Sequence, residues 1–154
     1  MKASVILNDD IYQAKGFSVS TDKTLLDIDF IYDFLDTKSY WAKGIPKEKL
    51  LTAIQESVCF GVYHHQQQVG FARVVSDKST FAYLADVFII PAYRKQGLSK
   101  WLMQNIMNYP DFKGLRRWLL ATADAHQLYK KFGFEPLNLP DRFMQIFTPY
   151  TTNN

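Results

Sequence analysis

Three consecutive strand patterns in the middle of the chain constrain its fold more than any other feature. They cover Val58–His64, Val69–Val75 and Phe81–Ile90, where β-branched and aromatic residues are frequent. The polar stretches between them, HQQQ and SDKST, have lengths typical of antiparallel hairpins. We therefore expect an antiparallel meander, whose apolar faces must be covered by other elements.

Helical patterns lie on both sides of this meander. Apolar residues recur at helix spacing between Asp27 and Asp36, and Pro46 is suited to the first turn of a second helix with Glu48 near its positive end. After Pro91 the period is helical again until Pro110. The apolar residues of the three helices are Ile28, Ile31, Tyr32 and Leu35, then Leu50, Leu51 and Ile54, then Leu98, Trp101, Leu102 and Ile106.

The ends of the chain complete a mixed topology. We expect strands at Phe17–Ser20 and Leu115–Thr122, a short helix between Asp124 and Gly133, and a final strand at Arg142–Phe147. Asp124 is the expected cap of that helix, with Gln127 completing a capping box. Together these elements predict an α/β (α+β) fold with a mixed central sheet of six to seven strands and helices on both faces. No repeat or linker divides the chain, so residues 1–154 are expected to form one domain.

Composition excludes several classes of protein. With 47% hydrophobic residues, the chain still has no run near the roughly 20 apolar residues of a membrane span. Its N-terminus does not resemble a secretion signal, and Cys59 is its only cysteine, so we expect a soluble cytoplasmic protein with no metal site. The 18 basic and 15 acidic residues are dispersed, which does not favour nucleic acid but suits an anionic small ligand.

A candidate anion site lies where the third strand of the meander leads into the next helix. Backbone N–H groups at a helix N-terminus are unpaired and point toward an anion, and Gly97 permits close approach to the backbone. Arg94, Lys95 and Lys100 add positive charge. The alternative is a helix that simply begins with glycine and exposed basic residues. Neither GxxxxGK[ST] nor GxGxxG is present, so the common nucleotide loops are excluded.

Two motifs in this half of the chain resemble those of the GCN5-related N-acetyltransferases (GNAT). The run IIPAYRKQGLS at 89–99 is similar to the family's [RQ]xxGx[GA] motif after a V-x-P strand end, with Ile89 in place of valine and Ser99 in place of the last small residue. The run LYKKFGF at 128–134 matches the family's LYxxxGF. The element order resembles the family's from Phe17 to Phe147, and the chain looks like a bacterial small-molecule-type member.

The resemblance implies acetyl-CoA as co-substrate and no metal. It places the pantetheine arm along the backbones of Val87, Phe88 and Ile89. It also implies that the following loop holds the pyrophosphate, through Arg94, Lys95, Gln96, Gly97, Leu98, Ser99 and Lys100. Tyr129 matches the family's tyrosine that gives a proton to the CoA thiolate.

In the family, a base takes a proton from the acceptor amine before the amine attacks the acetyl group. The residue that would act as this base here is less defined. Family carboxylates map onto Tyr83 and Arg117, and neither is an acid. Asp86 is the nearest acid on the central strand, but its strand parity is opposite to that of Tyr83, so it is expected to face the other side of the sheet. Proton loss through ordered water is the alternative.

Substrate-binding candidates come from three places. Asp86 and Arg73 lie nearly opposite across a hairpin, either as a structural ion pair or as a pair that orients an amine and a carboxylate. Tyr40 and Trp41 belong to the loop that covers the acceptor in the family, as a stacking wall or as a hydrophobic plug. His126 precedes Tyr129 by three residues, as a substrate ligand or as a solvated helix residue.

The resemblance thus implies an acetyl-CoA-dependent N-acetyltransferase. The expected acceptor is a primary amine of a small or amino-acid-like molecule, attacked directly in a ternary complex, with no nucleic-acid or membrane partner. Acetylation of a protein N-terminus or lysine and a non-catalytic acetyl-CoA-binding regulatory module are the alternatives. A homodimer is left open.

Overall fold

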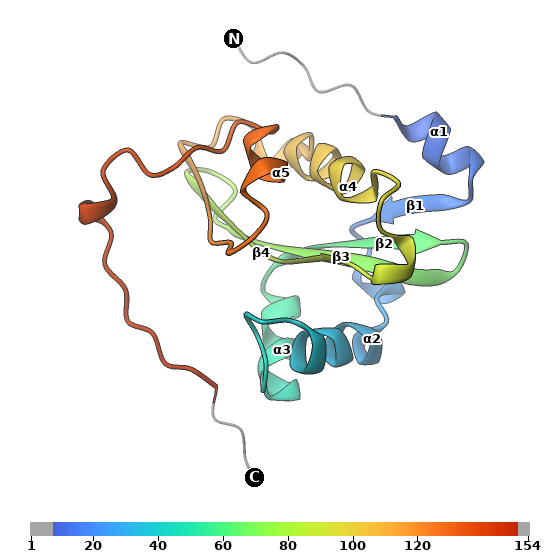
Figure 1. Ribbon diagram of the computed structural model, residues 1–154, viewed down its shortest axis with the longest axis horizontal. Coiled ribbons are helices and arrows are strands. Elements are labelled where there is room, and N and C mark those ends of the chain that lie inside the picture. The colour runs from blue at the N-terminus through green and yellow to red at the C-terminus, as the bar shows by residue number, and fades with distance from the viewer. Residues whose placement is uncertain (1–7, 151–154) are drawn as a thin grey trace.

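The computed structural model describes residues 8–150 and contains a five-stranded mixed sheet (Figure 1). The strands lie side by side in chain order. Neighbours are antiparallel from β1 to β4, whereas β4 and β5 are parallel. Their bounds are β1 (Phe17–Ser20), β2 (Val58–His64), β3 (Gln67–Ser76), β4 (Phe81–Ile89) and β5 (Arg117–Leu120). The meander and the α/β class are confirmed, and the predicted count of six to seven strands is too high.

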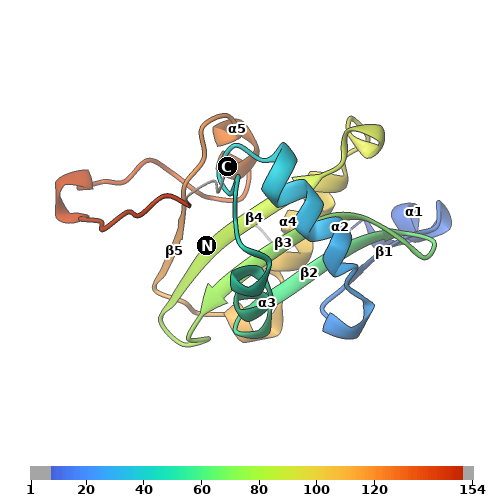
Figure 2. The ribbon, with the colours of Figure 1, turned by 90° about the horizontal axis from the view of Figure 1, so that it is seen from below.

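Helices cover both faces of the sheet, as Figures 1 and 2 show from two directions. On one face lie α1 (Asp9–Ala14), α4 (Leu98–Met107) and α5 (His126–Lys130); on the other lie α2 (Ile28–Asp33) and α3 (Lys47–Gln55). Each layer encloses a hydrophobic core. The α4 side buries Trp101, Leu102 and Ile106, and the α2–α3 side buries Ile31 and Leu50.

The predicted helices are present, but the structure differs from the prediction in the end of the first helix, in one residue of α3 and in an additional helix, α1. Asp27 caps α2 by accepting a hydrogen bond from the N–H of Phe30, and the chain then continues as a π-helical turn, Phe34–Lys38. On α3 the side chain of Leu51 is 46% exposed, so it does not belong to the buried stripe. The sequence pattern did not reveal α1, which has six residues and buries none of them.

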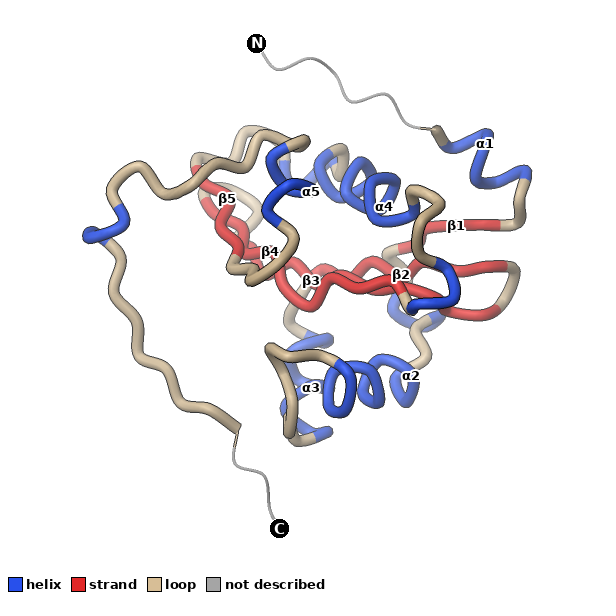
Figure 3. Tube along the Cα trace, viewed as in Figure 1, coloured by secondary structure: helices blue, strands red, loops and turns tan. Residues whose placement is uncertain are grey.

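The predicted strand at Arg142–Phe147 is wrong. A 3₁₀ turn at Pro140–Arg142 is followed by extended chain that has no strand partner in the described part of the chain and is drawn as loop in Figure 3. A strand needs a neighbouring edge for its backbone hydrogen bonds, and this segment leaves the sheet of its own chain. Its apolar pattern alone therefore did not determine its structure.

The predicted capping role of Asp124 is also wrong. Helix α5 begins at His126, and its first carbonyl comes from Ala125, so Asp124 is one residue too early to cap it. The hydroxyl of Thr122 instead accepts hydrogen bonds from the N–H groups of Asp124 and Ala125. The helix ends at Lys130 rather than at Gly133, and a turn over residues 131–133 follows it; Gly133 does have the predicted left-handed conformation, with a φ of +94°.

A β-bulge in β4 changes which way Asp86 faces. Phe71 pairs with Phe88, whereas Arg73 pairs with Ala85, so two β4 residues lie opposite the single Ala72. Asp86 itself has a left-handed φ of +56°. The extra residue reverses the alternation of side chains, so Asp86 lies on the same side of the sheet as Arg73. The prediction that Asp86 faces the side opposite Tyr83 is wrong for this reason.

Candidate active site

The loop from β4 to α4 presents six consecutive backbone N–H groups. Within the described chain, none of the N–H groups of residues 95–100 has an acceptor, and the first one used by α4 belongs to Trp101. Lys95 and Gly97 have left-handed φ values of +65° and +86°, which turn successive amides outward. This amide loop (residues 95–100) fits a pyrophosphate at the positive end of α4.

Helix α1 supports the amide loop from behind. The hydroxyl of Tyr12 donates a hydrogen bond of 3.0 Å to the carbonyl of Gln96, and its ring stacks on Trp101 at 4.7 Å. A Cβ on Gly97 would collide with this hydroxyl. Glycine is therefore required here both for its backbone conformation and for the approach of Tyr12.

An open strand edge adjoins the amide loop. β5 pairs with β4 only from Phe81 to Leu84, so the part of β4 from Ala85 to Ile89 has a strand neighbour on one side only. This edge fits the amides of a pantetheine arm, which would add to it as a strand does. The carbonyl of Ile89 already accepts a hydrogen bond from Arg94 Nε at 2.7 Å, which leaves Val87 and Phe88 as the better candidates for that contact.

Two ammonium groups lie together beside the start of α4. The neighbouring ammonium group of Lys100 lowers the pKa of Lys131, because two like charges oppose each other's protonation. Such a pair favours the binding of a phosphate, which would relieve the repulsion. The residues present therefore fit CoA, whose phosphates need this charge.

Substitution of Lys100 tests whether Lys100 and Lys131 together bind a phosphate of CoA. In Lys100→Gln we expect the pKa of Lys131 to rise toward its ordinary value, and acetyl-CoA to bind about fivefold more weakly at low salt. Added salt should weaken acetyl-CoA binding to the unmodified protein more steeply than to the variant. The matched control is Lys113→Gln, which follows the 3₁₀ turn after α4 and should bind acetyl-CoA unchanged; equal losses in both variants would contradict a phosphate site at Lys100.

A cavity of about 390 Å³ lies where β4 and β5 separate. We call it the β4–β5 pocket. Its lining includes the predicted residues Tyr40, Trp41, Arg73, Asp86, Val87 and Tyr129. These residues come from four separate parts of the chain, so it is the folding of the chain that brings them together around one pocket.

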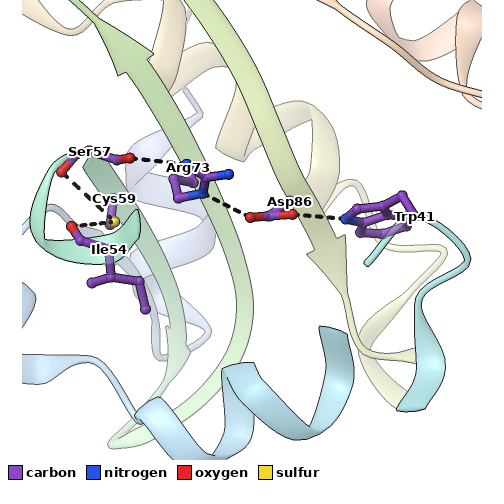
Figure 4. A network of polar contacts seen from close by, with 6 residues as sticks. All are labelled: Trp41, Ile54, Ser57, Cys59, Arg73 and Asp86. Carbon is purple, nitrogen blue, oxygen red and sulfur yellow. Dashed lines mark hydrogen bonds and ion pairs between the residues drawn. The ribbon is translucent and has the colours of Figure 1, made fainter. Parts of the chain in front are cut away.

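Asp86 and Arg73 form the ion pair that the hairpin predicted. Arg73 Nε donates to Asp86 Oδ2 at 2.8 Å, with side chains 18% and 8% exposed (Figure 4). The indole Nε1 of Trp41 donates to the other carboxylate oxygen at 2.9 Å. Ser57 Oγ accepts from Arg73 Nη1 at 3.2 Å, a contact that the sequence did not suggest.

The loop bearing Tyr40 and Trp41 is fixed over the pocket. The hydroxyl of Tyr40 accepts a hydrogen bond of 2.8 Å from the N–H of Ala123, beyond β5, while Trp41 reaches β4 through Asp86. At its base, the hydroxyl of Ser39 donates to the carbonyl of Leu35 and accepts from the N–H of Ala42. The loop therefore bridges both splayed strands as a lid.

Tyr129 is a buried phenol at the wall of this pocket. Burial, together with nearby Tyr40 and Asp124, raises its pKa to about 12. The hydroxyl therefore stays protonated throughout the physiological range, which is the form that can donate a proton or hydrogen bond.

Not every predicted residue lies in this pocket. His126 lines a second cavity, on the far side of β5, and Tyr129 borders both cavities. Conversely, Phe147 and Tyr150, near the end of the described chain, contribute to the β4–β5 pocket, although no sequence signal placed them there. Among residues 8–150 there is no cluster of three or more His, Cys, Asp or Glu that could hold a metal ion. The same residues include no helix long and apolar enough to cross a membrane.

The ion pair makes a prediction about stability. Asp86→Ala should lower the free energy of unfolding by about 3 kcal/mol, because it leaves the largely buried Arg73 without its partner. Asp86→Asn, which keeps the shape and tolerates the left-handed backbone, should lose less. Denaturant unfolding measures both. The control Asp29→Ala removes an exposed ion pair with Lys47 and should change stability little; a similarly small loss in Asp86→Ala would contradict the buried pair.

Comparisons with known proteins identify the family. The model of the acetyltransferase (GNAT) domain matches residues 55–136. A protein of Gibberella zeae described as an acetyltransferase is 33% identical over 136 residues, which cover 75% of this chain and 76% of that protein. A crystal structure described as a GNAT-family acetyltransferase of Xanthomonas campestris is 48% identical, with a TM-score of 0.86 over 88% of this chain and 97% of that one. The ribosomal-protein-S18-alanine N-acetyltransferase of Escherichia coli, 19% identical with a TM-score of 0.64 over 79% of each chain, shares the fold. The chain belongs to the GNAT family and is an N-acetyltransferase.

Proposed function

We propose that this protein, acting as a single domain over residues 1–154, transfers the acetyl group of acetyl-CoA to a primary amine of a small, amino-acid-like acceptor. The amine attacks directly in a ternary complex. The observation that carries the proposal is the placement of Tyr129 and the Asp86–Arg73 pair in one lidded pocket beside the amide loop. Acetyl-CoA supplies the thioester that is attacked.

The donor is held by backbone groups and by charge. The N–H groups of the amide loop bind the pyrophosphate, and the ammonium groups of Lys100 and Lys131 bind a further phosphate. Arg94 braces the end of β4 through the carbonyl of Ile89. Leu98 is buried, so it contributes its backbone amide rather than its side chain.

The acceptor is oriented by Asp86 and Arg73. Each oxygen of Asp86 accepts one hydrogen bond within the protein, and a carboxylate has further lone pairs that can bind an ammonium group. Arg73 donates Nε and Nη1 to Asp86 and Ser57, which leaves Nη2 for an acceptor carboxylate. An amino-acid-like molecule has both groups that this pair can bind.

The same residues provide the proton transfers. Asp86 binds the acceptor amine and receives its proton, directly or through water, so that the lone pair becomes available. Tyr129 donates to the sulfur as the bond between carbonyl carbon and sulfur breaks. The lid formed by Tyr40 and Trp41 holds the amine near the thioester and reduces its access to water.

Acetylation of a protein N-terminus is the second candidate. It is favoured by the fold shared with the Escherichia coli enzyme, which is named for the alanine of ribosomal protein S18. The lid favours the small acceptor, because Tyr40 and Trp41 bridge the groove that a peptide would occupy.

Initial rates separate the two candidates. We expect kcat/KM to be higher for free amino acids and related small amines than for peptides with the same N-terminal residue, and we expect intersecting double-reciprocal lines when both substrates are varied. Faster turnover of the peptides would favour the second candidate. Parallel lines would contradict direct attack, since they indicate an acetylated enzyme.

A further inference from the structure

The outer edge of β5 has no partner strand in residues 8–150. β5 is the last strand of the sheet and pairs only with β4. A cavity of about 390 Å³ lies along it, between β5 and the chain at residues 134–137. This β5 groove is mainly apolar, with Trp118, Leu120, Phe134 and Leu137 in its lining. An exposed strand edge beside an apolar groove is a site for a further strand.

The C-terminal segment (residues 142–147) has the features of such a strand. It reads RFMQIF, with large apolar side chains at four of its six positions, on both sides of an extended chain. Met144 is 97% and Ile146 is 100% exposed. Within residues 8–150, the only backbone hydrogen bonds made by this segment are those of its initial turn, from Arg142 and Phe143 to Leu139 and Pro140.

The segment does not enter the groove of its own chain. After residues 134–137 the chain turns at Pro140–Arg142 and forms an extended loop outside the sheet (Figures 1 and 2), and its end at Phe147 returns to the β4–β5 pocket rather than to the β5 groove. Phe143 lies against the guanidinium of Arg117, 4.9 Å from it, at the start of β5 rather than in the groove. The fold therefore contains both an unfilled strand position and an unpaired strand.

We propose that the C-terminal segment fills the β5 groove of a second copy of this chain, and that two copies exchange these segments reciprocally. In a dimer with twofold symmetry, each C-terminal segment would occupy the β5 groove of the other copy, so both copies would make the same contact. Met144 and Ile146 would enter the partner copy's groove, and the positive Arg142 would approach the negative Glu135 at its rim. The exchange would supply a sixth strand to the five that residues 8–150 of one chain form.

Strand exchange is a separate property from acetyl transfer, but the β5 groove lies next to the β4–β5 pocket. Leu120 and Tyr129 line both the β5 groove and the β4–β5 pocket, so the exchanged strand would buttress one wall of the pocket. Binding of acetyl-CoA to the amide loop does not depend on the exchange. Failure of either proposal can therefore be recognised separately.

Sedimentation equilibrium of the full chain provides the first test. We expect a dimer at micromolar concentration, and a monomer for the double variant Met144→Asp and Ile146→Asp. Both side chains are exposed, so this variant should fold normally. The matched control Leu25→Asp, also at an exposed apolar residue, should remain dimeric. A monomeric unmodified chain, or a dimer that persists in the double variant, would overturn the proposal.

Complementation distinguishes exchange from a segment that folds back on its own chain. Leu137→Asp alters the groove and leaves the C-terminal segment intact, so it should also be monomeric. Mixing it with the double variant should restore dimers, because one segment and one groove remain intact. No dimer in the mixture would overturn the exchange. If Leu137→Asp does not fold, hydrogen exchange of the unmodified chain decides: protection of residues 143–147 must increase with protein concentration, and constant protection would contradict the proposal.

Discussion

Tyr129→Phe is expected to lower kcat by about 100-fold or more while leaving the affinity for acetyl-CoA unchanged. The ring that packs in the core is kept, and only the proton donor is removed, so the loss falls on the chemical step. Because the pKa of Tyr129 is about 12, its ionisation should not cause a fall in rate between pH 7 and pH 10. Steady-state kinetics with calorimetric binding measures both quantities.

Tyr63→Phe is the matched control for this variant. Tyr63 is also a buried phenol, burial also raises its pKa to about 12, and its hydroxyl has no hydrogen-bond partner among residues 8–150. It does not line the β4–β5 pocket. We expect this variant to keep its kcat. A Tyr129→Phe protein that turns over as fast as Tyr63→Phe would show that Tyr129 only packs.

Gly97→Ala is expected to weaken acetyl-CoA binding by at least about tenfold, because a left-handed alanine is strained by about 1–2 kcal/mol. Its Cβ would also displace the Tyr12 hydroxyl that holds the carbonyl of Gln96. The amide loop would then lose the arrangement that the pyrophosphate requires. We expect KM for acetyl-CoA to rise with little change in kcat.

Gly114→Ala separates loop geometry from general backbone strain. Gly114 also has a left-handed φ, +75°, but apart from its chain neighbours no atom of the described residues lies within 4 Å of the position of an added Cβ. Both variants should lose stability through the left-handed alanine, and only Gly97→Ala should lose affinity for acetyl-CoA. Equal affinities in the two variants would contradict the role of the amide loop.

Local patterns were sufficient to predict most of the fold. The β-branched and aromatic residues of Val58–His64 and the hairpin lengths predicted β2 to β4, and the spacing of Leu98, Trp101 and Leu102 predicted α4. These signals work because each describes contacts within one hairpin or one helix face. The segment Arg142–Phe147 has an equally good strand pattern, but whether it pairs depends on an edge elsewhere in space.

The candidate site was predictable where its residues follow one another in the chain. Gly97 at a helix start indicated the anion loop, and the LYxxxGF run indicated Tyr129. The bulge at Asp86 was not predictable, because no glycine marks the left-handed position. Nor was the support given by Tyr12, which lies 84 residues from its partner Gln96.

Calorimetric titration of acetyl-CoA into the purified full chain tests the account most directly, because binding can be measured before the acceptor is known. We predict one site per chain with a Kd of about 1–100 μM, in the range of typical substrate affinities, and a weaker site in Gly97→Ala. The absence of binding heat at several temperatures, in folded protein freed of copurified CoA, would contradict the assignment of the amide loop as the acetyl-CoA site.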